Sequence, residues 1–293
     1  MNILIAGSSG IIGEGVAANT SKFGNLFNIN RKHKVDNNSA KINLSSIQEV
    51  DEYFKHSQYY EILIFLVGLA HSKGSSATKE DHIKINYNTL KNCLDSMCKY
   101  EKIPCKIIFA STISVYGENF KKEIYDEEDS LNPKSPYAIS KSIAEDFLIK
   151  EYKYKSWIMR LAPVYSDEFI LNIKRRSKIK NFYYRVGNGE NKLSLCNMQN
   201  ISLVLDAILE GKVPPGIYNI SDAQVYSYND LIKISKAKSI IIIPKIFIYL
   251  VYLIGKIFNI NFLIENSIKL LTNNTYPSKK IQKYMKLSFN LFD

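Results

Sequence analysis

Three polar residues mark the part of the chain where chemistry can occur. Thr112 follows the apolar run 106–110, which is typical of a buried parallel strand. Tyr137 and Lys141 lie four residues apart in a segment with helical apolar spacing, so their side chains share one helix face. An ammonium group one turn away stabilises a phenolate and lowers the tyrosine pKa, which is near 10 in water. We predict that Tyr137 exchanges a proton with a substrate oxygen that the Thr112 hydroxyl holds.

The spacing Tyr-x-x-x-Lys is common by chance, and alone it favours a structural role. The amino-terminal segment supports the chemical interpretation. An apolar strand at 1–6 runs directly into Gly7-x-x-Gly10-x-x-Gly13, and a helical pattern follows. Glycines permit a tight turn and close approach of backbone N–H groups to phosphate, and the helix amino terminus adds donors and a positive dipole. This order of strand, turn and helix predicts a dinucleotide site at Gly7 to Gly13, which includes Ile11 and Ile12.

The elements that must position these residues alternate between strand and helix. Further apolar runs predict strands at 25–30, 61–66 and 157–161, and helical spacing covers 81–99. Alternation of this kind predicts an α/β fold with a Rossmann-like, doubly wound parallel sheet. Thr112 then lies at the carboxyl end of a strand, where such sheets bind their ligands.

The domain prediction follows the point at which this alternation loosens. We expect a dinucleotide-binding domain over 1–165, to which 196–221 returns as a helix and a strand. The smaller substrate-binding region, also α/β, then comprises 166–195 and 222–293. A chain of 293 residues is long enough to bury a large core in this arrangement.

The residues after the second predicted strand bear on the choice of dinucleotide. Many NAD-binding folds carry an acid here for the ribose hydroxyls. This chain has Asn30 followed by Arg31 and Lys32, which favours NADP because two cations suit a 2′-phosphate. The alternative is a solvated basic turn.

Small residues also follow the strand at 61–66. Leu69 and Ala70 would let a flat cofactor lie across the strand end, and His71 comes next. His71 is as compatible with a place in the active site as with an ordinary loop position.

Composition excludes several classes of protein. The net charge is +11, but the lysines are scattered and no nucleic-acid motif is present, so we expect no nucleic-acid partner. The four cysteines lack CxxC spacing and histidine partners, which predicts no metal site and reduced thiols in a cytoplasmic protein. Strand-like sequence begins at residue 1 without a basic leader, so no signal peptide is predicted.

One strongly apolar segment, 240–258, is interrupted by Pro244, Lys245, Gly255 and Lys256. Its longest uninterrupted part is far shorter than the roughly 20 residues of a membrane span. We therefore predict a buried helix of the substrate-binding region, with a surface-lying amphipathic helix as the alternative and no transmembrane anchor.

Together the motifs resemble the extended short-chain dehydrogenase/reductases, and within them the nucleotide-sugar epimerase/dehydratase branch. The resemblance rests on the glycine turn, on Ser111-Thr112 ahead of Val115-Tyr-Gly117, and on Pro136-Tyr-Ala-Ile-Ser-Lys141. Asn86 and the segment 160–165 also match positions of that branch. The similarity covers nearly the whole chain.

The resemblance implies a set of roles. It makes Thr112, Tyr137 and Lys141 the catalytic triad, and Lys141 a ligand of the nicotinamide ribose. It implies NAD or NADP as cofactor, a nucleotide-sugar substrate in the production of polysaccharide precursors, and a homodimer. It also implies that Gly7, Gly10, Gly13 and Asn86 bind the cofactor. Asn172 and Lys192 would bind the substrate phosphates, and relatives often carry an arginine near the position of Lys192.

The resemblance is compatible with two reactions, C4 epimerisation and 4-keto reduction. Ile113 replaces the acid that follows the catalytic threonine in dehydratases, which disfavours a 4,6-dehydratase. In a C4 epimerase, hydride passes to tightly held NAD and returns after the keto sugar has rotated. In a 4-ketoreductase, NADPH delivers hydride and Tyr137 donates the proton. A cofactor-binding scaffold without turnover is a third reading, disfavoured because Tyr137 and Lys141 are both present.

Overall fold

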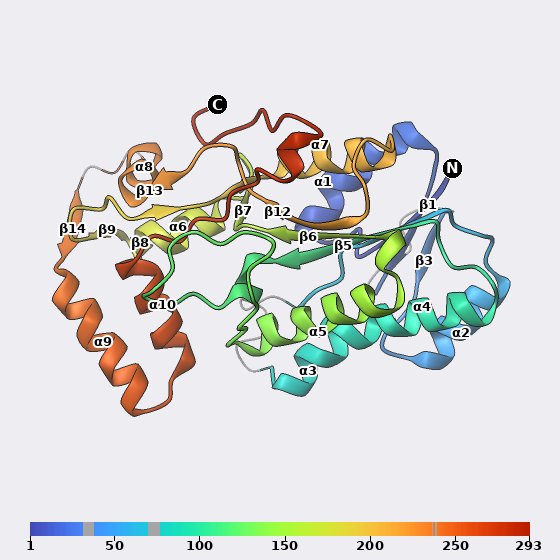
Figure 1. The fold of residues 1–293 in the computed structure, drawn as a ribbon, viewed down its shortest axis with the longest axis horizontal. Coiled ribbons are helices and arrows are strands. Elements are labelled where there is room, and N and C mark those ends of the chain that lie inside the picture. The colour runs from blue at the N-terminus through green and yellow to red at the C-terminus, as the bar shows by residue number, and fades with distance from the viewer. Residues whose placement is uncertain (32–37, 70–76, 236, 238) are drawn as a thin grey trace. The chain divides into compact units, whose positions relative to one another are not determined.

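A computed structural model describes residues 1–31, 38–69, 77–235, 237 and 239–293 of the chain (Figure 1). Its centre is a seven-stranded parallel sheet with the order β12-β6-β5-β4-β1-β2-β3. The predicted Rossmann-like α/β fold is therefore confirmed. The strands are β1 (Asn2–Ala6), β2 (Asn25–Asn30), β3 (Ser39–Lys41), β4 (Ile62–Phe65), β5 (Lys106–Thr112), β6 (Ser156–Leu161) and β12 (Gly216–Ile220).

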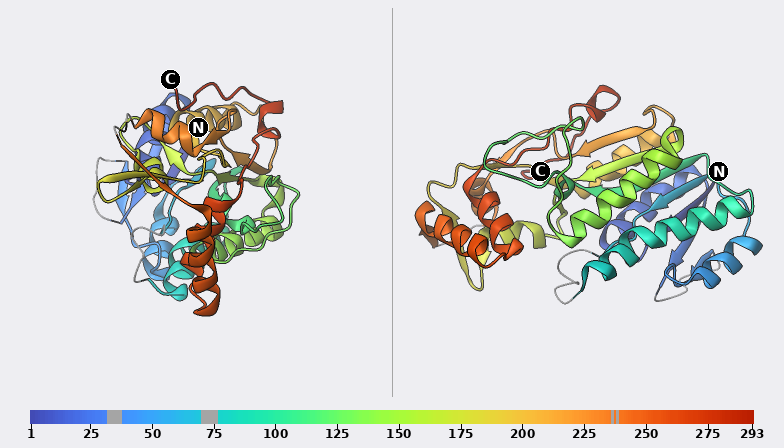
Figure 2. Two further views of the ribbon diagram at one scale, coloured as in Figure 1. Left: turned by 90° about the vertical axis from the view of Figure 1, so that its left-hand side faces the viewer. Right: turned by 60° about the horizontal axis from the view of Figure 1, so that its bottom comes forward.

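Helices cover both faces of this sheet. Helices α1 and α7 lie on one face, and α2, α4 and α5 lie on the other (Figures 1 and 2). Because both faces are covered, the central strands are rich in apolar residues, and all four residues of β4 are buried. The helices are α1 (Ile11–Thr20), α2 (Ile47–His56), α3 (Lys79–Ile83), α4 (Thr89–Lys99), α5 (Pro136–Glu151) and α7 (Met198–Leu209), with a π-helical turn at Lys84–Asn88 between α3 and α4.

Local sequence signals set where several helices begin. Ser46 caps α2 by accepting a hydrogen bond from the Glu49 N–H at 3.3 Å. Thr78 and Asp81 form a reciprocal capping box at the start of α3. Such caps satisfy N–H groups that have no acceptor within the helix.

The chain divides into two compact units. The first comprises 1–112, 136–160 and 202–218, and the second comprises 113–135, 161–201 and 219–293. The first unit contains most of the central sheet. In this division, residues 113–135 and 161–165, which the sequence analysis places in the dinucleotide-binding domain, group with the second unit.

The second unit is built from short elements. They form a three-stranded sheet β14-β9-β8, two strand pairs, β10-β13 and β11-β7, and four helices among the described residues. Their bounds are β7 (Val164–Tyr165), α6 (Leu171–Ser177), β8 (Lys178–Ile179), β9 (Phe182–Val186), β10 (Lys192–Leu193), β11 (Cys196–Asn197), β13 (Tyr226–Ser227), α8 (Tyr228–Ile234), β14 (Ile240–Ile243), α9 (Lys245–Ile257) and α10 (Asn261–Leu271).

The apolar segment 240–258 forms β14 and α9, and the prediction of a buried helix is wrong. Within α9 only Gly255 is buried, while Ile257 is 73% exposed. The helix packs against α10, and Tyr252 contacts the Phe120 ring, but most of its large apolar side chains stay exposed. Within the described part of the chain, no helix has both the length and the hydropathy that crossing a membrane requires.

Candidate active site

The end of β5 and the start of α5 bring Thr112 and Tyr137 together. Thr112 is the last residue of β5, and Tyr137 is the second residue of α5. Their side chains share a hydrogen bond. Tyr137 keeps part of its surface exposed, whereas Thr112 is buried. A phenol with this placement is reachable from solvent and is fixed on one side by a hydroxyl.

Lys141 lies one helical turn after Tyr137 and is only 3% exposed. Its Nζ atom donates hydrogen bonds to the carbonyl oxygens of Ala110, at 2.8 Å, and Val67, at 3.2 Å. Nζ also lies 4.6 Å from the centroid of the Phe109 ring. The amine is therefore held at the carboxyl ends of the neighbouring strands β4 and β5.

The electrostatics of this pair differ from the prediction. Desolvation raises the pKa of Tyr137 to about 12, and the hydrogen bond from Thr112 only partly opposes this rise. The predicted lowering of the Tyr137 pKa by Lys141 is therefore wrong for this structure. Burial lowers the pKa of Lys141 to about 7, while Glu145 acts in the opposite direction.

The glycine turn combines tight packing with open space. Gly7 has a φ of 91°, and a Cβ on Gly13 would lie 2.3 Å from the Gly7 carbonyl oxygen, so neither position admits a side chain. Gly10 differs, since a Cβ there would meet only the Gly7 oxygen, at 3.4 Å. Gly10 is also the N-cap of α1, whose first N–H groups, at Ile11 to Gly13, have no acceptor within the helix. This space beside a helix amino terminus fits a dinucleotide phosphate.

Asn30 has a partner within this turn. It is the last residue of β2 and is 3% exposed, and its Oδ1 atom accepts hydrogen bonds from Ser8 Oγ at 2.9 Å and the Ser9 N–H at 3.0 Å. The side chain therefore braces the glycine turn from the end of β2. Arg31 follows and is exposed. Lys32 lies outside the described residues.

Asn86 ties the segment after β4 to α5. It is fully buried in the π-helical turn, where its Oδ1 accepts a hydrogen bond from the Leu69 N–H at 2.6 Å. Its Nδ2 donates to Ser140 Oγ at 2.9 Å. Single π-helical turns inside α-helices are frequent at functional sites. Asn86 thus fixes the backbone at Leu69 and the helix that carries Lys141, whereas Ala70 and His71 lie outside the described residues.

A position that the sequence reading missed lies beside Lys141. A Cβ on Gly68 would lie 3.5 Å from both Lys141 Nζ and Asn86 Oδ1. Any side chain at position 68 would therefore cover the amine. The glycine leaves this side of Lys141 open to a ligand.

The sequence reading also missed a buried charge network beneath the triad. Glu145 lies one turn after Lys141, is fully buried, and pairs with Arg160 of β6, whose Nη2 is 2.8 Å from Oε2. Ser111, the neighbour of Thr112, donates a hydrogen bond to the same carboxylate. Two features of the sequence could have indicated this network. Glu145 is a charged residue four positions after Lys141, and Arg160 lies within the apolar run 157–161.

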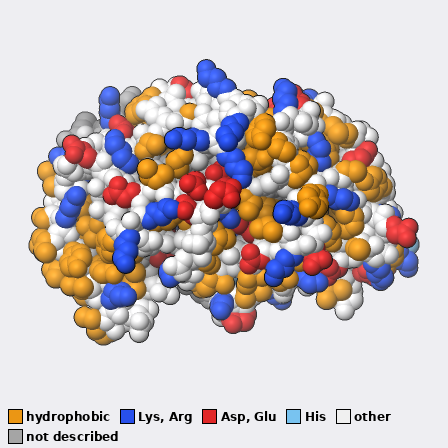
Figure 3. All heavy atoms as spheres, in the orientation of Figure 1, with side chains coloured by type: hydrophobic (Ala, Val, Ile, Leu, Met, Phe, Trp, Pro, Cys, Tyr) orange, Lys and Arg blue, Asp and Glu red, His pale blue; other side chains and the backbone are white. Residues whose placement is uncertain are grey.

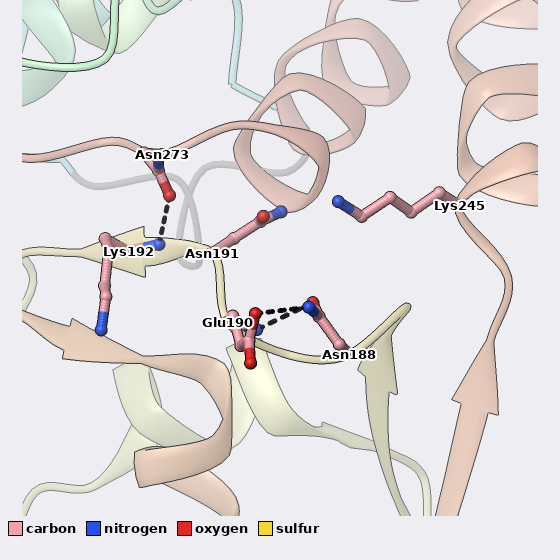
Figure 4. Close-up of a pocket in the computed structure, with 6 residues that line it drawn as sticks. All are labelled: Asn188, Glu190, Asn191, Lys192, Lys245 and Asn273. Carbon is pink, nitrogen blue, oxygen red and sulfur yellow. Dashed lines mark hydrogen bonds between the residues drawn. The ribbon is translucent and has the colours of Figure 1, made fainter.

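The two predicted substrate ligands lie in the second unit. Asn172 is partly buried in α6, and its Nδ2 donates a hydrogen bond to the Val164 carbonyl at 2.8 Å. Lys192 is exposed and borders a polar hollow of about 510 Å³. Lys245 extends toward Asn191 in this hollow, while the Lys192 side chain points away from it (Figure 4). The lining residues are Asn188, Glu190, Asn191, Lys192, Lys245 and Asn273.

The described residues contain no group of three or more His, Cys, Asp or Glu side chains that could hold a metal ion. The polar groups around Tyr137 are hydroxyl, amine, amide and imidazole side chains, the last being His82, whose ring lies 6.3 Å from that of Tyr137. They suit hydrogen bonding and proton transfer.

Comparisons with known proteins agree with this geometry. Residues 3–221 match the model of the NAD dependent epimerase/dehydratase family. A search of curated proteins finds no match.

Solved structures show the same fold. UDP-glucose 4-epimerase from Thermotoga maritima, solved with UDP-glucose, has a TM-score of 0.68 at 23% identity, over 83% of this chain and 86% of the other. A hypothetical dTDP-4-dehydrorhamnose reductase from Sulfolobus tokodaii has a TM-score of 0.74 at 17% identity, over 100% and 98%. The dTDP-glucose 4,6-dehydratase from Bacillus anthracis, in complex with NAD, has a TM-score of 0.70 at 16% identity, over 99% and 92%.

Proposed function

The chain belongs to the NAD dependent epimerase/dehydratase family, NAD(P)-dependent enzymes of the extended short-chain dehydrogenase/reductase type, and we propose that it is a nucleotide-sugar 4-epimerase. The observation that carries the proposal is the hydrogen bond between Thr112 and Tyr137, with Lys141 one turn further along the same helix. This arrangement can move a proton to and from one sugar oxygen. The orientation of the bound sugar, and not this arrangement, then determines which configuration forms at C4.

The residues of the first unit would hold the dinucleotide. The backbone N–H groups from Ile11 to Gly13 would bind the phosphate, and Lys141 would bind the nicotinamide ribose. Asn86 acts indirectly, because it fixes the backbone at Leu69. When bound, the dinucleotide supplies the hydride acceptor and donor for the sugar C4 carbon.

The side chains of the protein carry out the proton transfer. Thr112 holds the C4 oxygen by a hydrogen bond, and Tyr137 removes the hydroxyl proton as C4 is oxidised and returns it as C4 is reduced. Because the pKa of Tyr137 is about 12, its hydroxyl is protonated at neutral pH and poised to donate. In the oxidising direction Tyr137 acts from its phenolate form, which a protonated Lys141 amine stabilises, and taking the C4 hydroxyl proton converts it to the phenol.

We assign the nucleotide-sugar phosphates to Asn172 and Lys192 of the second unit, and we propose a homodimer as the assembly. Each of these assignments rests on the resemblance of the sequence to this family. The exposure of the Lys192 side chain supports the second ligand, because its ammonium group can reach a phosphate.

A second function is favoured by one observation. Asn30 stands where many NAD enzymes carry an acid, and its side chain already binds Ser8 and Ser9, while the exposed Arg31 is available to a 2′-phosphate. These features support NADP and an NADPH-dependent nucleotide-4-keto-sugar reductase.

The dinucleotide itself distinguishes the two functions. Freshly purified protein is denatured, and the released dinucleotide is identified and quantified by mass spectrometry. Near-stoichiometric NAD supports the epimerase, whose cofactor stays through the cycle. Release of no dinucleotide, with NADPH binding more tightly than NADH on addition, supports the reductase and contradicts the epimerase.

A further inference from the structure

The second unit exposes a concentration of apolar side chains that the proposed reaction does not use. Of the 27 large hydrophobic side chains that are exposed in the described residues, 13 lie between Ile240 and Phe262. We call these 13 side chains the hairpin face, since most belong to the antiparallel pair α9 and α10. They crowd the α9 end of the second unit, where lysines and arginines lie among them (Figure 3). Exposed apolar areas of this kind mark interaction sites.

The hairpin face covers about half the circumference of α9, taken at about 100° per residue. The opposite side is used for packing, and a Cβ on Gly255 would lie 3.0 Å from the Cβ of Leu263 in α10. Lys245 and Lys256 are both exposed and lie along one border of the apolar arc. A half-apolar helix bordered by lysines is typical of helices that lie in a membrane interface.

Two segments of the second unit, one carrying the hairpin face and one paired with it, contain basic residues and no acidic residue. The segment 231–264 contains lysines but no Asp or Glu. The segment 169–189 contains lysines and arginines and likewise no Asp or Glu. Parallel pairing of β14 with β9 brings these two segments side by side. The exposed cations of the second segment include Lys174, Arg175 and Lys180. The charge of this region is therefore complementary to an anionic surface.

We propose that the hairpin face docks in the plane of a lipid bilayer that contains anionic lipids. Helix α9 has 13 residues, so at about 1.5 Å per residue it is too short to cross the hydrocarbon core. Docking buries its apolar arc among the lipid chains while the lysines face the headgroups. A second copy of the chain is a poorer occupant, because it would bring the same positive charges together.

The test uses the full chain and vesicles. Co-sedimentation is measured with phosphatidylcholine vesicles and with vesicles of phosphatidylcholine and phosphatidylglycerol, at low and high salt. We expect binding to the anionic vesicles that weakens at high salt. The triple variant I257S/F258S/F262S should reduce the partition coefficient by more than about tenfold. Neutralising Lys256 by Lys256→Gln should reduce it about fivefold at low salt.

A matched control removes exposed apolar side chains elsewhere. Ile47 is 65% exposed and Tyr154 is 85% exposed, and I47S/Y154S should bind vesicles as the parent protein does. Because the three hairpin side chains are exposed, the triple variant should keep the parent melting temperature.

A second readout reports insertion directly. The chain has a single tryptophan, Trp157, which is 5% exposed and donates a hydrogen bond to the Val213 carbonyl. A tryptophan introduced by Phe258→Trp should therefore give a blue shift on addition of anionic vesicles that the parent does not show. Absence of vesicle binding, unchanged binding of the triple variant, or hairpin-dependent association with protein alone overturns the proposal.

Discussion

Tyr137 and Lys141 share one helix face, yet their pKa values move in opposite directions. The pKa of Tyr137 rises to about 12 and that of Lys141 falls to about 7. The cause is the same for both, because desolvation disfavours whichever form carries the charge. The sequence shows that the two residues share a face, but the depth at which they lie depends on tertiary packing. For this reason the spacing shows which face the two residues share and missed the sign of the Tyr137 pKa shift.

Replacing Tyr137 by phenylalanine removes the proton-transfer group and little else. We expect Tyr137→Phe to lower turnover by about 10²- to 10⁴-fold, because one hydroxyl carries the proton. Dinucleotide content and melting temperature should stay close to those of the parent. Steady-state kinetics together with the dinucleotide released on denaturation provide the check, and near-normal turnover of the variant would refute the mechanism.

The buried amine of Lys141 should make stability depend on pH. Its pKa is about 7 in the folded protein, well below the ordinary lysine value of 10.5, so between these values the unfolded chain binds more protons. The free energy of unfolding contributed by this group therefore rises with pH across that window. Relative to Lys141→Met, the dinucleotide-free parent should gain stability from pH 7 to 9.5 in urea titrations. A pH-independent difference between the two proteins would contradict the burial of this amine.

At the scale of elements, two glycines of one turn should respond differently to substitution. Gly10 has open space around its missing side chain, whereas a Cβ on Gly13 would overlap the Gly7 carbonyl. We expect Gly10→Val to keep the melting temperature but lose dinucleotide affinity, because the side chain fills the phosphate space. Gly13→Ala should instead lower the melting temperature.

Titration calorimetry with NAD and NADP, and thermal unfolding, separate these effects. Undiminished affinity in Gly10→Val would show that phosphate binds elsewhere. The glycine pattern predicted the turn, but only the packing distances distinguish the glycine that makes room for a ligand from those that make room for backbone.

The buried pair Glu145–Arg160 joins α5 to β6 and, through Ser111, to β5. Arg160→Met leaves the Glu145 carboxylate without its cation, so we expect a loss of about 3–5 kcal/mol in the free energy of unfolding. Glu145→Gln combined with Arg160→Met should recover part of this loss, since no buried charge is left unpaired. Urea unfolding of the single and double variants measures the coupling. A double variant no more stable than Arg160→Met would contradict it.

The strands and helices of the central sheet were largely predictable for a physical reason. A parallel strand covered on both faces is rich in apolar residues, and the run predicted as a strand at 61–66 forms the fully buried β4, one residue shorter at each end. The pairing of Glu145 with Arg160 was not predictable, because it joins residues of different elements whose adjacency only the folded sheet creates.

At the scale of the whole molecule, α9 shows the limit of hydrophobic patterning. The run 246–254 predicts a helix with apolar sides, and α9 forms there, but the pattern does not say what covers it. The expected burial in a core is wrong, since most of these side chains are exposed. The matched family extends over 3–221 and ends before this segment.

The most direct test of the central claim is turnover of nucleotide hexoses without added dinucleotide. The parent protein and Tyr137→Phe are incubated with UDP-, dTDP- and GDP-hexoses, and the configuration at C4 is followed by proton NMR. We predict that the parent converts one of these sugars to an equilibrium mixture of its C4 epimers, and that Tyr137→Phe does so at a far lower rate. Absence of C4 inversion in every sugar, together with consumption of NADPH when a 4-keto sugar is supplied, would contradict the epimerase.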